Sequence, residues 1–310
     1  MIPASNSNPQ HSVLQSDPTQ SIDPTYTGHI SQITSSPPSK NQYNTIWSAW
    51  EKGAAQGKGE QRDIAVVRMQ DCLERNANAL DLSNLNLSSM PDILPEHITM
   101  LTLDNNKIAW LPDHLPTNLR HLHACNNEIY RLPNHFPENL SDLILSGNSL
   151  KAFPENLPLS ITRLDVSYNQ IEGEVRILPA NLHHIDLSNN KIDVIPDEIP
   201  KFSQHLNLNN NKLKSRSCDF PDSIQYFNLG HNELTTLPDD LPRSIKYLDL
   251  SNNNLQTLPA CITWLPRNTV IHIEKTSSTN KRHRNYNVFY TTPTAIYLFD
   301  FLCMSTHRLE

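Results

Sequence analysis

The chain has 310 residues, of which 23 are proline and seven are glycine, and it carries a formal net charge of −7. This negative charge disfavours general nucleic-acid binding, and no apolar run approaches the ~18 residues that a membrane-spanning helix requires. The five cysteines are scattered without a C-x-x-C pair, which argues against a disulfide framework or a zinc site, so Cys72, Cys125 and Cys218 are predicted to be ordinary reduced thiols.

Residues 1–42 are rich in Ser, Pro, Gln, Asn and Thr, and their charged residues are limited to Asp17, Asp23 and Lys40. Such a segment cannot bury enough apolar surface to form a core, so it is predicted to be disordered. It lacks the basic start and apolar centre of a general secretory signal. Composition alone therefore favours a flexible tail over a targeting segment.

Residues 43–76 are predicted to form two helices around a glycine-containing turn. Trp47 and Trp50 are three residues apart and therefore share one face of the first helix. The apolar residues assigned to the second helix are Ile64, Val67, Met69, Cys72 and Leu73. The repeat array that follows would expose apolar surface and an unpaired strand edge at its open end. These helices are therefore predicted to form an N-terminal cap.

An asparagine recurs every 21 residues in the next segment. The eight positions are Asn106, Asn127, Asn148, Asn169, Asn190, Asn211, Asn232 and Asn253. Apolar residues stand five and three positions before each of them, as Leu101 and Leu103 do before Asn106, and Ala124 is the small exception. A constant period of this kind indicates stacked repeats that share one core.

Two leucines in a Leu-x-Leu pattern point to the same side of a strand. The asparagine suits the turn that follows, where its side chain is predicted to join a ladder that pairs buried backbone groups. The Leu-Pro pairs after the turn favour an extended return on the convex side. The sequence therefore predicts an α/β solenoid of the leucine-rich-repeat type, with nine repeats of 21 residues over residues 80–265 and a parallel concave sheet.

Some copies depart from the repeat. The first copy, near Leu80, has Leu85 in the asparagine position, as expected of a terminal repeat. In two later copies Glu174-Val175 and Arg216-Ser217 replace the Leu-Pro pair, and the convex side is predicted to be distorted there. Residues 266–310 are predicted to be an irregular tail, in which the stretch NTVIHIE fits one last strand.

The residues that flank the strand leucines are predicted to lie on the concave face and to bind a partner protein. The candidates are His121, His123, Ile144, Arg163, Asp165, His184, Asp186, His205, Tyr226 and Tyr247. Tyrosine and arginine are favoured interface anchors, which makes Tyr226, Tyr247 and Arg163 candidate anchors. The alternative for the tyrosines is a lateral stack of two rings between strands. Ile144 is predicted to be exposed among polar neighbours.

His184, His205 and Asp186 are neighbours in this arrangement, but a flat sheet spreads their side chains apart, whereas zinc needs converging ligands. No metal, no other cofactor and no catalytic residue is therefore predicted. Protonation of the histidines near pH 6 would make the face positive. This hypothesis predicts tighter binding to an acidic partner as the pH falls from about 7.5 to about 5.5.

The helices and the repeats together resemble one bacterial family. The segments IWSAWEK and AVVRMQDCL, joined to Leu-Pro-x-x-Leu-Pro repeats, are similar to those of the type III secreted leucine-rich-repeat effectors, which include IpaH, SlrP, the SspH proteins and YopM. The resemblance covers residues 43 to about 274. It implies that residues 1–42 are an export signal read by the type III secretion apparatus, with a secretion chaperone as a further candidate partner.

The resemblance also implies secretion into the host cell cytoplasm and a host protein as the partner of the repeats. The basic run Lys281-Arg282-His283-Arg284 adds the nucleus as an alternative destination. Many family members continue into a ubiquitin-ligase domain whose nucleophile is a cysteine in a C-x-D motif. The cysteines of this chain stand in other contexts, namely Cys72-Leu-Glu, Cys125-Asn-Asn, Cys218-Asp-Phe, Cys261-Ile-Thr and Cys303-Met-Ser.

The resemblance therefore favours a secreted virulence effector without catalytic activity, similar to a member truncated before the ligase domain. Two alternatives stay open. One is the substrate-recognition part of an E3 ubiquitin-protein ligase whose catalytic domain is missing. The other is an inert, folded remnant.

Overall fold

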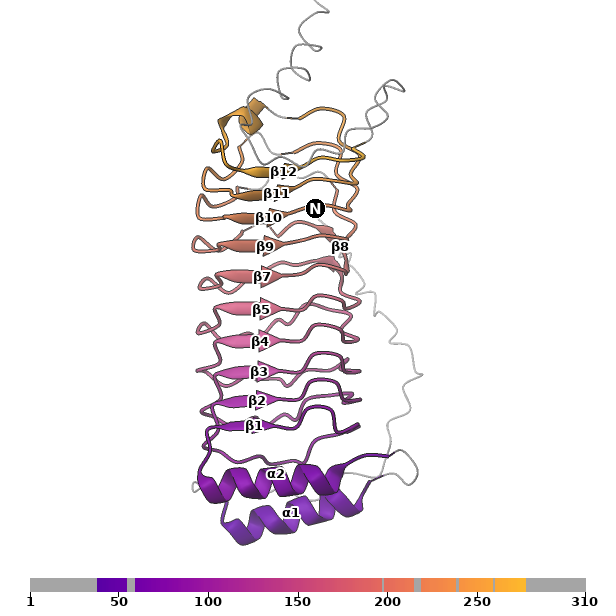
Figure 1. The fold of residues 1–310 in the computed structure, drawn as a ribbon, viewed down its shortest axis with the longest axis vertical. Coiled ribbons are helices and arrows are strands. Elements are labelled where there is room, and N and C mark those ends of the chain that lie inside the picture. The colour runs from indigo at the N-terminus through magenta and orange to yellow at the C-terminus, as the bar shows by residue number, and fades with distance from the viewer. Residues whose placement is uncertain are drawn as a thin grey trace, which may run out of the picture. The chain divides into compact units, whose positions relative to one another are not determined.

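The computed structural model describes residues 38–54, 59–196, 198–214, 219–237, 240–258 and 260–276. Most of the predicted export segment and the tail after residue 276 lie outside these ranges, as does the departure at Arg216-Ser217. The described chain consists of two helices followed by a stack of short turns, each of which contributes a strand to one sheet (Figure 1).

Ten parallel strands form this sheet in the order β1-β2-β3-β4-β5-β7-β9-β10-β11-β12. Their bounds are β1 Ala79–Asp81, β2 Met100–Thr102, β3 His121–His123, β4 Asp142–Ile144, β5 Arg163–Asp165, β7 His184–Asp186, β9 His205–Asn207, β10 Tyr226–Asn228, β11 Tyr247–Asp249 and β12 Val270–His272. Neighbouring strands pair in register, so that Leu101 lies beside Leu122 and Leu122 beside Leu143. The predicted leucine-rich-repeat solenoid is confirmed, and β12 is the last strand that NTVIHIE indicated.

The middle residue of each strand points into the core. Leu101 and Leu143 are completely buried, as are Leu103 and Leu145 two positions later. Both leucines of each Leu-x-Leu pattern therefore pack between neighbouring turns, in one core that continues along the stack. Burying a leucine side chain contributes ~1.5–3 kcal/mol, so the stacked leucines are the main favourable term in the stability of the array.

The recurring asparagines join each turn to the one before it. The amide nitrogen of Asn106 donates to the carbonyl oxygens of Leu103 at 2.8 Å and Leu82 at 2.9 Å. Its amide oxygen accepts the backbone N–H of Leu87 at 3.0 Å. The same pattern continues as far as Asn253, whose amide oxygen accepts from Leu234 at 3.1 Å. All eight asparagines are buried, so each pairs backbone groups that water does not reach.

A second, two-stranded parallel sheet lies on the other side of the turns. It consists of β6 Glu172–Glu174 and β8 Lys191–Val194, and its register shifts after Gly173. This sheet begins where Glu174-Val175 replaces the usual Leu-Pro pair. Val175, which stands at the proline position of the repeat, is completely buried.

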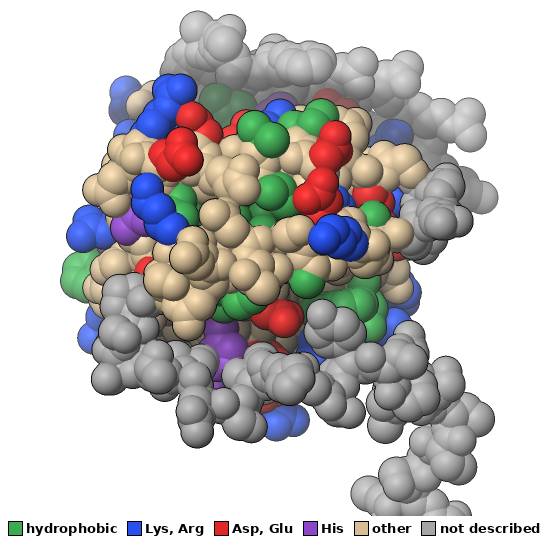
Figure 2. Space-filling view, turned by 90° about the horizontal axis from the view of Figure 1, so that it is seen from below, with side chains coloured by type: hydrophobic (Ala, Val, Ile, Leu, Met, Phe, Trp, Pro, Cys, Tyr) green, Lys and Arg blue, Asp and Glu red, His purple; other side chains and the backbone are tan. Residues whose placement is uncertain are grey.

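Two helices cover the N-terminal end of the stack (Figure 1). Helix α1, Lys40–Lys52, begins with a capping box between Ser39 and Gln42. Helix α2, Arg62–Arg75, ends at Asn76 in the left-handed conformation. Seen from this end, the exposed hydrophobic side chains are separated by polar and charged groups (Figure 2). The helices thus place their main apolar face on the first turn and a mixed surface on the outside.

Two of the apolar residues assigned to α2 do not face the core. Ile64 and Val67 are 39% and 63% exposed. The buried residues of this helix are Arg62, Ala65, Val66, Met69 and Cys72. At 3.6 residues per turn those positions form one stripe, and Ile64 and Val67 lie on the opposite side of the helix. A count of apolar residues alone does not reveal this face, because an arginine is buried in it.

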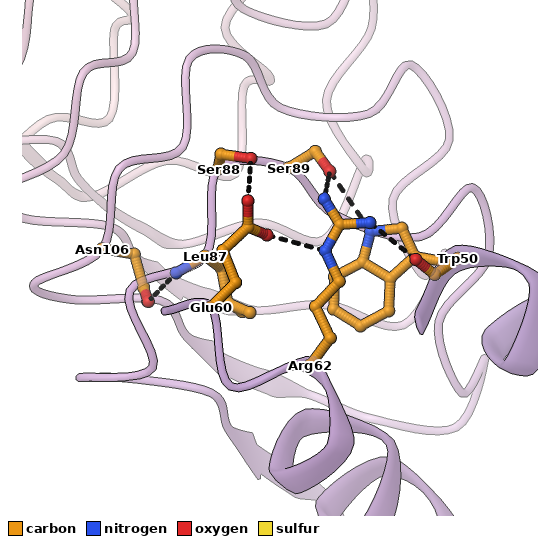
Figure 3. Close-up of polar contacts among 7 residues, drawn as sticks. All are labelled: Trp50, Glu60, Arg62, Leu87, Ser88, Ser89 and Asn106. Carbon is orange, nitrogen blue, oxygen red and sulfur yellow. Dashed lines mark hydrogen bonds and ion pairs between the residues drawn. The ribbon is translucent and has the colours of Figure 1, made fainter. Parts of the chain in front are cut away.

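Arg62 fixes the second helix to the first turn of the solenoid (Figure 3). Its guanidinium donates to Glu60 Oε2 at 2.7 Å, to the Trp50 carbonyl oxygen at 2.6 Å and to Ser89 Oγ at 3.1 Å, and lies 4.7 Å from the centre of the Trp50 ring. Ser88 Oγ donates to the other carboxylate oxygen of Glu60 at 2.7 Å. Burial raises the pKa of Glu60, but the hydrogen bonds from Ser88 and Arg62 outweigh this effect and lower it overall.

Candidate functional site

Two rows of side chains lie on the sheet face opposite the core. The first-position row is formed by the first residue of each strand and includes Met100, His121, Asp142, Arg163, His184, His205, Tyr226 and Tyr247. The third-position row is formed by the last residue and includes Asp81, Thr102, His123, Ile144, Asp165, Asp186, Asn207, Asn228, Asp249 and His272. The structure thus places all ten candidate binding residues in these two rows.

Four rings of the first-position row stack into an aromatic column formed by His184, His205, Tyr226 and Tyr247. Their centroids are 3.9, 4.2 and 4.6 Å apart in that order, and their planes deviate by 12°, 4° and 3°. His272 of β12 extends the column at a tilt of 44°. The lateral stack considered for the two tyrosines therefore exists and is longer than expected. Because the ring faces cover one another, the column presents ring edges and polar atoms to its surroundings.

The pKa values of His184 and His205 are both lowered. Burial and the neighbouring His184 lower the pKa of His205 to about 4. Burial and Arg163 likewise lower the pKa of His184. The lowered pKa of His205 contradicts, at this residue, the hypothesis that protonation near pH 6 makes the face positive. The sequence showed that the rings are neighbours, but it did not show that they would stack closely enough to exclude water from one another.

The phenol of Tyr247 is uncharged at neutral pH, and that of Tyr226 makes a hydrogen bond within its own strand. Burial and the carboxylate of Asp249 raise the pKa of Tyr247 to about 12. The hydroxyl oxygen of Tyr226 accepts from the side-chain nitrogen of Asn228 at 3.3 Å. The Tyr226 phenol is thus held by the third residue of its own strand, which restricts its rotation before any partner arrives.

The aspartates of the third-position row have a structural role that the sequence analysis missed. Oδ1 of Asp165 accepts both the N–H and the hydroxyl of Ser167, at 2.9 and 2.7 Å. Asp186 makes the same pair of bonds with Ser188, at 2.9 and 2.7 Å. The recurring Asp-x-Ser was the available signal, because Asp favours turns in which it caps its own backbone two residues later.

The remaining candidate binding residues differ in how accessible their side chains are to a partner. His121 Nδ1 lies 2.6 Å from Asp142 Oδ2, so these two side chains pair with each other. Arg163 is exposed. Ile144 is only 8% exposed, and the prediction that it is exposed is wrong. His123 and Asp165 flank it in register on the neighbouring strands, which leaves little of its side chain open to water.

Within the described ranges, no group of three or more His, Cys, Asp or Glu side chains is arranged to hold a metal ion. His184 and His205 meet through their ring faces, which does not direct two nitrogens at a common point. The helices of the same part of the chain are too short or too polar to cross a membrane.

Comparison with known proteins agrees with this architecture. Residues 5–67 match the type III secretion system leucine rich repeat protein family, and residues 181–202 and 244–265 match the leucine rich repeat family. The leucine-rich-repeat domain of a Shigella effector superposes with a TM-score of 0.52 at 28% sequence identity, over 76% of this chain and 98% of that chain. The chain is a leucine-rich-repeat protein, and it resembles the type III secreted effectors.

Two curated relatives share part of this chain's sequence. The outer membrane protein YopM of Yersinia pestis is 48% identical over 69 residues, which cover 20% of this chain and 17% of YopM. The E3 ubiquitin-protein ligase ipaH9.8 of Shigella flexneri is 44% identical over 64 residues, which cover 17% of this chain and 11% of the ligase. The family resemblance predicted from the sequence is confirmed. The chain matches less than a fifth of either relative's length.

Proposed function

We propose that the effector recognises a host protein through the solvent-facing side of its ten-stranded sheet and performs no chemistry of its own. The observation that carries this proposal is the aromatic column, whose rings are ordered by stacking on a rigid sheet. Aromatic side chains fixed in advance lose little conformational entropy when a partner binds. They also supply large contact area at interfaces.

The size of the face supports a protein partner. Neighbouring strands lie ~4.8 Å apart, so ten strands extend over roughly 43 Å. A standard protein interface buries ~800 Å² on each side, which a surface of this length can provide.

The described cysteines support the absence of thiol catalysis. Cys72 and Cys261 are buried. Burial, together with Asp104 and Asp165, raises the pKa of the Cys125 thiol to about 11, which leaves very little nucleophilic thiolate at neutral pH. Cys218 and Cys303 lie outside the described residues.

Delivery to the host is the second part of the proposal. The match to the type III secretion family begins at residue 5, within the segment proposed as the export signal. We expect residues 1–42 to engage the secretion apparatus, with a chaperone as a candidate helper, and the host cytoplasm to be the destination. Nuclear import through Lys281-Arg282-His283-Arg284 is a separate hypothesis. A translocation reporter fused to residues 1–42 tests export.

Site-specific photo-crosslinking tests recognition. A photoreactive phenylalanine analogue is placed at Tyr226 on the sheet face or, as a matched control, at Tyr130, which is 60% exposed and lies outside the ten-stranded sheet. We expect a discrete adduct with a host protein from position 226 and none from position 130. Adducts of equal yield from both positions, or from neither, would contradict recognition through this face.

A ubiquitin ligase is the second candidate, because the relatives ipaH9.8 of Shigella flexneri and SlrP of Salmonella typhimurium carry the name E3 ubiquitin-protein ligase. The matched segments cover only 11% and 6% of those proteins, so the similarity does not support ligase activity in this chain. An assay with E1 and E2 enzymes separates the two candidates. Ubiquitin chains whose formation depends on one of the five cysteines would favour the ligase, and their absence would favour recognition alone.

A further inference from the structure

The third-position row carries negative charge that its turns do not require. One carboxylate oxygen of Asp165 and of Asp186 accepts the backbone N–H two residues later, at 2.9 Å in both strands. Asn207 and Asn228 occupy the same position in the next two strands and accept the same bond through their amide oxygens, at 3.2 and 3.0 Å. An amide oxygen is therefore sufficient for the backbone bond of this turn. The aspartates also accept the hydroxyls of Ser167 and Ser188, both at 2.7 Å, and Asp186 Oδ2 accepts the side-chain nitrogen of Asn207 at 2.9 Å. None of these bonds neutralises the two carboxylates.

This charge is unfavourable for the isolated fold. Asp165 and Asp186 are register partners on the neighbouring strands β5 and β7. Side chains that are directly opposite on adjacent strands lie ~4.5–5.5 Å apart, and like charges in this position destabilise a sheet. A cationic ligand would offset this repulsion.

Negative charge prevails over the whole face. The two rows contain the carboxylates of Asp81, Asp142, Asp165, Asp186 and Asp249, against the single guanidinium of Arg163. Asp142 is already paired with His121. The two column histidines add no positive charge at neutral pH, because their pKa values are lowered. A partner with positive charge is therefore electrostatically complementary to this surface.

The aromatic column borders this row for most of its length. Tyr226 and Tyr247 stand on the same strands as Asn228 and Asp249, two residues earlier and on the same side of the sheet. Lysine and arginine combine a charged head with an apolar stem, so they can contact a carboxylate and an adjacent ring edge at once. The two rows together fit side chains of this kind.

We propose that the third-position row from Asp165 to Asp249 binds a basic segment of the partner protein, rich in lysine or arginine. This inference rests on the proposed recognition function and names the chemistry of the bound segment. The row crosses four strand intervals of ~4.8 Å, or roughly 19 Å, and an extended chain covers this distance with about six residues.

A defined peptide tests the charge requirement. The probe is a fluorescent twelve-residue peptide of alternating arginine and serine, and a peptide of alternating glutamate and serine serves as its opposite, both measured by anisotropy in ~150 mM salt. We expect the wild-type effector to bind the arginine peptide and not the glutamate peptide. The double variant Asp165→Asn/Asp186→Asn should bind it about five- to tenfold more weakly.

A charge-matched variant controls for non-specific attraction. Glu155→Gln/Glu172→Gln removes the same charge from exposed positions outside the ten-stranded sheet. It should bind the arginine peptide as the wild type does. The thermal midpoint of Asp165→Asn/Asp186→Asn should stay unchanged or rise, because Asn207 and Asn228 already close their turns. Failure of the wild type to bind the arginine peptide, or equal weakening in both double variants, would overturn the inference.

The crosslinking experiment separates this inference from the proposed function. The partner peptide attached at position 226 is sequenced, and its net charge is counted. A lysine- or arginine-rich attachment site supports the basic segment. A neutral or acidic site refutes it while host recognition still stands, and the absence of any adduct at position 226 refutes both.

Discussion

At the scale of single residues, the turn after each strand requires one unusual backbone conformation. The residue before each ladder asparagine has a positive φ, and most turns supply Asn or Gly there, as Asn105 with φ 58° and Gly147 with φ 71° do. Tyr168 adopts φ 52° at the same position, and its side chain is 64% exposed. The left-handed region is unfavourable for a bulky residue, so the exposed ring is retained at a cost in stability.

We expect Tyr168→Asn to increase the free energy of unfolding by about 0.5–1 kcal/mol, because asparagine tolerates the left-handed region better than tyrosine. Urea denaturation followed by circular dichroism measures the change. The reciprocal variant Asn189→Tyr, at φ 56° one turn later, should lose a similar amount. A variant Tyr168→Asn that is less stable than the wild type would show that the ring makes stabilising contacts.

His205 makes stability depend on pH with a defined sign. Its pKa is about 4 in the fold, against 6.5 for a histidine side chain surrounded by water, so the unfolded chain takes up the proton first as the pH falls. The stabilisation is therefore complete above pH ~6.5 and is lost as the pH falls towards ~4. His205→Tyr keeps a ring in the column and removes this titration. We expect its unfolding free energy to decline less over that range, by about 1–2 kcal/mol after allowance for solvent screening.

Denaturation of the wild type and of His205→Tyr at pH 7, 5.5 and 4.5 provides the test, because the carboxylates common to both proteins cancel in the difference. Parallel stability curves would show that His205 titrates normally in the fold.

At the scale of elements, the Arg62 cluster connects the cap to the repeats. The side chains of Arg62 and Glu60 are only 8% and 1% exposed. Removing one member of such a buried pair leaves the other charge without compensation, whereas removing both is often much less harmful. The cluster therefore determines how the second helix is placed on the first turn, and its net contribution to stability is smaller than its number of contacts suggests.

We expect Arg62→Met to destabilise the protein by about 3 kcal/mol, because it leaves the Glu60 carboxylate buried without its cation. The double variant Glu60→Gln/Arg62→Met should recover at least about 1 kcal/mol of this loss. A double-mutant cycle with chemical denaturation measures both quantities. Additive losses in the cycle would argue against a coupled pair.

The sequence was sufficient to predict the repeat architecture, but not the side-chain contacts between neighbouring turns or between the cap and the first turn. The period of 21 residues predicted the strands, the buried leucines and the rows to which the candidates belong. The list of apolar residues did not specify the inward face of α2, because a charged residue, Arg62, occupies the core-facing stripe. The titration of His205 was misread because the water it loses is displaced by rings from neighbouring turns. Periodicity specifies which side a residue faces, but not how closely its neighbours approach.

At the scale of the whole molecule, each turn of the described stack is bonded to its immediate neighbours. Asn148 donates to Leu145 at 2.9 Å and Ala124 at 2.8 Å, and accepts from Ile129 at 2.9 Å. These partners lie in its own turn or the one before. In such an array the free energy of unfolding is close to the sum of the contributions of the single turns and of the interfaces between neighbouring turns. A destabilising substitution should therefore affect mainly the turns next to it.

We expect Asn148→Ala to cost about 1–3 kcal/mol, because it leaves buried backbone groups without partners. Hydrogen exchange should accelerate in the turns on either side of position 148, and the amides that surround Asn232 should keep most of their protection. Uniform acceleration along the stack would indicate that the array unfolds as a single cooperative unit.

The even pitch of the turns has a consequence for how a bound chain is aligned. If the face repeated identically, a ligand could bind in several registers of nearly equal affinity, each shifted by one turn. Here the amides of Asn207 and Asn228 separate Asp186 from Asp249 and leave a two-strand interval without formal charge in that row. A ligand whose positive charges match this interval has only one alignment in which all of them meet a carboxylate. The irregular positions of the array, and not its regular period, would therefore determine the register in which the ligand binds.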